Sequence, residues 1–186
     1  MAMWDEMPMR HGRTMLLAGL LVAALGGCTR DLPADVAALG YVNRECRFAM
    51  NVPAGWTVRE SRGTIVAVAT GPAAAGEGEA NVTVVVDPAP DLATLDELVR
   101  TNRGQTAALG GFRLIAEEPR TLADGRQAQA VTFEQAAIGQ AVRQRQLYVL
   151  AADRAYTVTA TASPPEAFAG HEADFETVLG SFRAGW

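Results

Sequence analysis

Four strand-like runs joined by short turns follow one another between residues 112 and 162, and they constrain the fold more than any other feature. The runs read FRLIAEE, QAQAVTFEQ, QAVRQRQLYVLA and AYTVTATA, and the turns between them include LADGR, Ile138-Gly139 and ADR. Strands that follow one another through short turns pair as antiparallel neighbours. This part of the sequence therefore predicts an antiparallel meander.

The residues before the meander add more strands. Cys46, Phe48, Met50 and Val52 share one face of a predicted half-buried strand that ends at Pro53. The runs WTVRE, TIVAVAT and NVTVVVD are read as the next strands, and the composition of GPAAAGEGEA predicts a loop between the last two. Cys46 then takes an inward position, where a free cysteine behaves as a small hydrophobic residue.

Two segments have helical periodicity. One follows Asp91, with Thr94 and Glu97 as a capping box, Asp91 as a competing N-cap, and an apolar stripe that includes Leu98 and Leu109. The other opens with SPPE, so that Ser163 is the expected N-cap. Its apolar stripe consists of Phe168, Phe175, Val178, Leu179 and Phe182. The sequence thus predicts an α+β fold: an antiparallel sheet of about seven strands with helices packed on it.

The N-terminal region has the features of an export signal. Residues 15–25 carry no charge, and a run of this length fits a signal peptide but is too short to span a bilayer. Arg10 and Arg13 supply a basic lead, whereas Asp5 and Glu6 do not belong in one. Translation from Met9, or from Met7, would remove those two acids, so we take Met9 as the candidate true start and Met7 as the alternative.

Leu25-Gly26-Gly27-Cys28 resembles a bacterial lipobox, in which an aliphatic residue and two small residues precede a cysteine. In a lipobox the thiol takes a diacylglycerol group, the signal peptidase cuts before the cysteine, and the new α-amino group is acylated as well. Cleavage would therefore fall between Gly27 and Cys28, and more than one acyl chain gives stable anchoring. The alternative is an ordinary signal peptide with an incidental cysteine.

These features divide the chain into three parts. Residues 1–27 are the expected lipoprotein signal peptide, 28–44 a lipid-anchored tether, and 45–186 the folded domain. The expected location is the bacterial cell envelope. Because Thr29 rather than Asp follows the cysteine, the sorting rule of bacterial lipoproteins implies the periplasmic face of the outer membrane in a Gram-negative host.

The charge balance bears on partners. The formal net charge of −5 argues against nucleic acid, because phosphate neutralisation needs a basic surface. The expected contacts are the membrane, through lipid on Cys28, and an envelope protein.

Five segments occur in an order that is known from other proteins: FAMNVPAGW, LATLDEL, GRQAQAVTFEQ, RQRQLYVLAADRAYTVTATA and FETVLGSFR, over about residues 45–183. This order resembles the PsbP-like fold, and within it the bacterial DcrB-related proteins, which share the fold with the Mog family of Ran-binding proteins. Lipoproteins of actinobacterial envelopes with the same fold are a close alternative. The resemblance implies a non-catalytic accessory, adaptor or assembly module.

Motifs that would indicate a catalytic, metal-binding or cofactor-binding site are weak in this sequence. His171 has Glu172 and Asp174 nearby in sequence, but its helical position places it beside Phe168 and Phe175. We find no metal-ligand spacing, G-x-S-x-G elbow, P-loop or dinucleotide-binding glycine pattern, so no cofactor, metal or catalytic residue is predicted. Glu117 and Glu118 are adjacent on a strand and therefore point to opposite sides.

Arg143 and Arg145 share one strand face and form a candidate interaction patch for an acidic partner or a lipid headgroup. The alternatives are a solvated face or cross-strand pairing with Glu134. Three functions follow for the whole chain: a lipid-anchored interaction or assembly module, a carrier of a small apolar or lipid ligand, and an envelope hydrolase that depends on His171. The carrier requires a cavity of several hundred Å³, lined by apolar residues, between sheet and helix.

Overall fold

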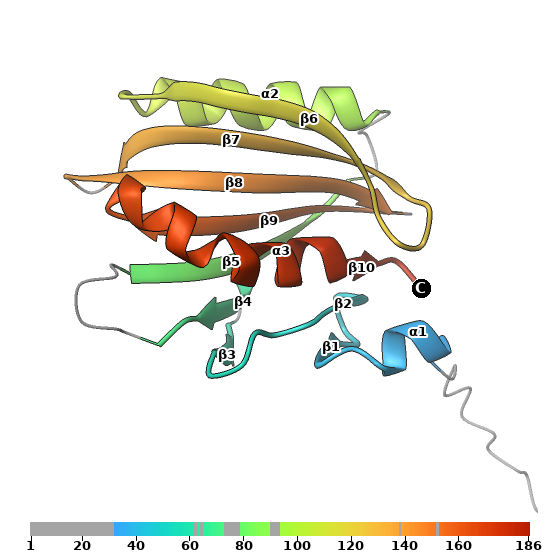
Figure 1. Cartoon of the computed structure of the whole chain (residues 1–186). Coiled ribbons are helices and arrows are strands. Elements are labelled where there is room, and N and C mark those ends of the chain that lie inside the picture. Colours follow the sequence, from blue (N-terminus) through green and yellow to red (C-terminus); the bar gives the residue numbers. More distant parts are fainter. Residues whose placement is uncertain are drawn as a thin grey trace, which may run out of the picture. The chain divides into compact units, whose positions relative to one another are not determined.

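The computed structural model describes residues 32–61, 63, 65–72, 79–89, 94–137, 139–151 and 153–186. Its main sheet has seven antiparallel strands in the order β3-β4-β5-β9-β8-β7-β6 (Figure 1). Their bounds are β3 Thr57–Glu60, β4 Ile65–Thr70, β5 Glu79–Pro88, β6 Arg113–Thr121, β7 Gln127–Ala137, β8 Gln140–Ala151 and β9 Arg154–Ser163. The predicted α+β class, with an antiparallel sheet of seven strands, is confirmed.

The meander forms as predicted. Strands β6, β7, β8 and β9 pair in chain order, each antiparallel to the next. In the β6–β7 turn Leu122 donates its backbone N–H to the carbonyl of Arg126 at 2.9 Å, and Gly125 has a φ of +82° that favours glycine. Strand β5 then pairs along its whole length with β9, so the chain must cross back to the far edge of the sheet before β6 begins.

Helix α2 (Leu95–Ala108) makes that crossing. Thr94 is its N-cap, and the Thr94 side chain accepts a hydrogen bond from the backbone N–H of Glu97 at 3.2 Å. Of the two predicted caps, the structure therefore uses Thr94; Asp91 lies outside the described residues. Leu98 is buried as expected, but Leu109 is 75% exposed because the helix ends before it.

A second, small sheet lies against the face of the main sheet that is opposite α2. It consists of β1 (Tyr41–Asn43), β2 (Phe48–Met50) and β10 (Arg183–Ala184), in the order β1-β2-β10. The predicted strand at Cys46–Val52 is thus shorter, and Ala49 is as fully buried as its neighbours because β2 is paired on both edges. Cys46 precedes the strand, and it is half-buried against the core rather than fully buried.

The compact unit also begins earlier in the chain than residue 45. A short helix, α1 (Ala34–Ala37), and strand β1 fall within the segment 28–44 that we expected to be a tether. Val36 is 3% exposed, and the Tyr41 hydroxyl donates to Glu60 of β3 at 2.8 Å. The part of this segment from Leu32 onward therefore belongs to the domain.

The last helical segment differs from the prediction at its start. Ser163 is the final residue of β9, paired with Glu79, so it is not an N-cap. A 3₁₀ helix, η1 (Pro165–His171), follows, and α3 (Glu172–Ser181) continues from it. The apolar stripe is confirmed, because its members are all buried: Phe168, Phe175, Val178, Leu179 and Phe182.

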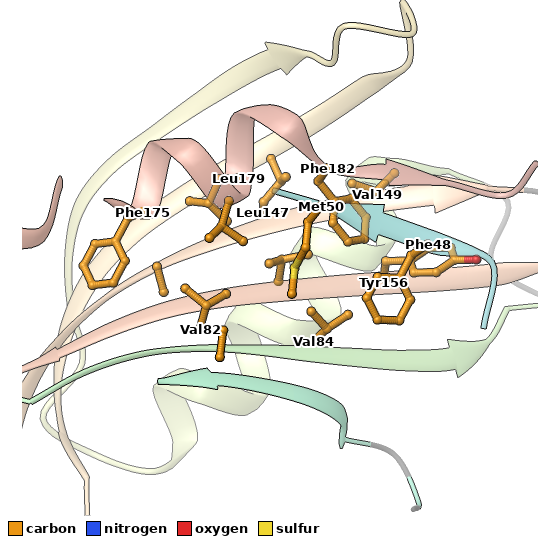
Figure 2. Close-up of a cluster of buried hydrophobic side chains, with 14 of the residues drawn as sticks. Phe48, Met50, Val82, Val84, Leu147, Val149, Tyr156, Phe175, Leu179 and Phe182 are labelled. Carbon is orange, nitrogen blue, oxygen red and sulfur yellow. The ribbon is translucent and has the colours of Figure 1, made fainter. Parts of the chain in front are cut away.

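The main core fills the space between the sheet and α3 (Figure 2). Phe182 stacks on Phe48 of β2 with ring centroids 5.7 Å apart and meets Tyr156 of β9 edge-on at 5.9 Å. This contact joins both sheets to the end of α3. A second core lies under α2 on the opposite face, where Val131, Phe133 and Tyr148 alternate along β7 and β8 with residues of the main core.

Candidate functional site

The predicted lipidation site lies outside the described residues. Gly27 and Cys28 belong to the segment before Leu32, as does the candidate start Met9, so the structure places none of them. Among the described helices, none is both long and apolar enough to cross a membrane. Lipid attachment to Cys28 stays a prediction from the sequence.

Arg143, half of the candidate interaction patch, lies in the middle of a charged group on β6, β7 and β8. Its guanidinium donates two hydrogen bonds to Glu134 on the neighbouring strand, at 3.1 and 2.6 Å. Arg113 of β6 reaches the other oxygen of Glu134 at 2.5 Å. Hydrogen bonds from Arg143, and then from Arg113, hold the pKa of Glu134 below its usual range. The cross-strand pairing considered from the sequence is therefore present.

Arg145, the other half, points toward α3. Its side chain is only 15% exposed, and it donates to Glu176 at 2.6 Å and to Glu172 at 3.0 Å. It also donates to the Thr132 hydroxyl at 3.2 Å and places its guanidinium carbon 5.4 Å from the centre of the Phe168 ring. Both arginines of the patch thus have acidic partners within this chain. Binding of an external acidic group by them stays a prediction.

Glu176 extends this group in a way that sequence reasoning missed. It accepts two further hydrogen bonds from Arg120 of β6, at 3.1 and 3.0 Å, and these bonds raise the pKa of Arg120. Arg120 also pairs with Glu118 at 2.9 Å. A faint signal existed in the sequence, since Glu172 and Glu176 are four residues apart and so share one side of a helix.

The two adjacent carboxylates of β6 behave as expected. Glu117 pairs with Arg103 of α2 at 2.7 Å, while Glu118 lies with Arg120 on the α3 side. They therefore face opposite sides of the sheet and cannot act together on one substrate.

His171 is buried at the junction of η1 and α3. It is 7% exposed, its ring centre lies 6.0 Å from that of Phe175, and its Nε2 has no hydrogen-bond partner within the described part of the chain. The nearby Asp174 accepts instead from the indole N–H of Trp56 at 3.2 Å. Across the ranges that the structure describes, no three His, Cys, Asp or Glu residues are grouped so that they could hold a metal ion.

The space between sheet and α3 does not match the carrier hypothesis. The cavity found there, beside Arg145, Leu147 and Leu179, has about 40 Å³, which is room for one or two water molecules. Larger hollows of about 380 and 290 Å³ adjoin Cys46, away from α3, and their walls include Glu45, Glu60 and Asp153. A further hollow of about 460 Å³ lies where β9 ends, beside Glu79, Gln140 and Pro164. They are not the apolar pocket that a carrier between sheet and helix requires.

The comparisons with known proteins identify the family. The DcrB family model matches residues 49–181 of the chain. The chain belongs to the DcrB family. The matched range runs from β2 to the end of α3 and so includes every residue of the charged groups around Glu134 and Glu176. The comparison with curated proteins gives no match.

Solved structures show that this DcrB-family domain shares the PsbP-like fold. The solution structure of cyanobacterial PsbP (CyanoP) from Synechocystis is 16% identical, with a TM-score of 0.57, and the match covers 77% of this chain and 90% of that one. LpqN of Mycobacterium tuberculosis, described as involved in cell envelope biogenesis, is 13% identical with a TM-score of 0.57 and coverages of 75% and 83%. The Ran-binding protein Mog1p of Saccharomyces cerevisiae is 13% identical with a TM-score of 0.55 and coverages of 77% and 93%.

Proposed function

We propose that this DcrB-family protein is a lipid-anchored accessory protein of the bacterial cell envelope that acts by binding an envelope protein and not by catalysis. The observation that carries the proposal is the lipobox-like sequence Leu25-Gly26-Gly27-Cys28 immediately before a domain of this family. Acyl chains on Cys28 would hold the domain at a membrane surface, on the periplasmic side of the outer membrane in a Gram-negative host.

The uses of this fold elsewhere support the binding role. LpqN is involved in cell envelope biogenesis, and Mog1p binds Ran. The charged side chains of this chain agree with such a role. Arg120, Arg143 and Arg145 are matched by carboxylates that connect strands to one another and to α3. Such pairs hold the strands and α3 in fixed positions relative to one another.

Replacement of the lipidated cysteine tests the anchor. A Cys28→Ser variant, expressed in a bacterial host with radiolabelled palmitate, should lose the label and either leave the membrane fraction or accumulate at the size of the precursor. Cys46→Ser is the matched control, because Cys46 is the other cysteine of the chain and lies in the folded domain. Unchanged labelling and membrane attachment in Cys28→Ser would refute the anchor.

The binding role is tested by crosslinking the lipidated protein in its own envelope and identifying the captured proteins. Arg143→Gln examines the candidate patch, and Arg113→Gln is its control because both variants remove one guanidinium from Glu134. We expect Arg143→Gln to weaken capture of an acidic partner and Arg113→Gln to leave it unchanged. Equal capture of the partner by both variants would show that Arg143 is not part of the binding surface.

A further inference from the structure

No further inference is drawn: the strongest candidate, the surface patch of exposed apolar side chains that Leu109, Leu114 and Ile115 present where the chain passes from α2 into β6, carries none because nothing in the structure shows what covers it.

Discussion

Arg145 on β8 donates a hydrogen bond to Glu176 on α3 over 2.6 Å, and this pair fastens the C-terminal helix to the centre of the sheet. The Arg145 side chain is 15% exposed and therefore needs its carboxylate partner. Arg120 approaches the same carboxylate from β6. One glutamate thus joins three elements that are distant in the sequence.

Loss of this carboxylate should destabilise the domain. Glu176→Gln keeps the shape of the side chain and removes its charge, so we expect the free energy of unfolding to fall by about 1.5–3 kcal/mol, the range for hydrogen bonds to charged groups. Urea denaturation measures this value. Glu166→Gln, at an exposed position of η1, is the control and should change this free energy little. Equal unfolding free energies for the two variants would contradict a stabilising role for Glu176.

Two glycines near the C-terminus should respond in opposite directions to alanine. At Gly185 a Cβ would lie 2.7 Å from the Cβ of Ala151, and its φ is +72°, so Gly185→Ala should destabilise the domain by about 1–3 kcal/mol. At Gly180, inside α3, a Cβ meets nothing within 4 Å, so Gly180→Ala should stabilise it by up to about 1 kcal/mol. Thermal unfolding of both variants gives the comparison. Gly185→Ala that melts at or above the wild-type temperature would show that the backbone there adapts.

Alkaline conditions should unfold the protein. Burial raises the pKa of Tyr41 to about 12, and burial also raises the pKa of Tyr148 and of Tyr156 above the ordinary value. The folded state thus holds these phenol protons more tightly than the unfolded chain, so their contribution is intact below about pH 10 and is lost as the pH rises toward 12. The sequence has no lysine to titrate in this window.

The free energy of unfolding, measured at intervals between pH 8 and pH 11.5, should fall steadily above about pH 10. Tyr41→Phe should make that fall less steep, because one of the three groups is removed. An equally steep fall in Tyr41→Phe would show that Tyr41 does not contribute.

His171 should be replaceable by an apolar residue. Its Nε2 is buried without a hydrogen-bond partner among the described residues, which is a cost that leucine avoids while it fills a similar volume. We expect His171→Leu to keep the free energy of unfolding within about 1 kcal/mol of the wild type, whereas His171→Ala should lower it by about 2 kcal/mol through the cavity it leaves. A free energy of unfolding far below the wild-type value in His171→Leu would indicate that the imidazole makes a polar contact. The same variant tests the hydrolase hypothesis, which requires His171 for an activity.

Local patterns in the sequence determined the meander, the capping box of Thr94 and Glu97 as one of two candidate caps, and the buried stripe of the last helix. Period-two alternation, a capping box and period-3.6 spacing each depend on neighbours within a few residues, so they can be recognised without the fold. The resemblance to the DcrB-related and PsbP-like proteins rested on the order of these local elements. The sequence also contains the lipobox-like motif, which lies outside the residues that the structure describes.

Only the tertiary structure decided which distant residues meet. The ten-residue pairing of β5 with β9, the small sheet that draws β10 back to β2, and the joining of Arg120 and Arg145 at Glu176 all link residues far apart in the chain. Such contacts depend on the packing of whole faces, and a one-residue shift of register would move every side chain of a strand to the other face. For this reason the sequence left open whether Arg143 and Arg145 form a free basic patch or pair across strands, and the fold places Arg143 with Glu134 and Arg145 with Glu176.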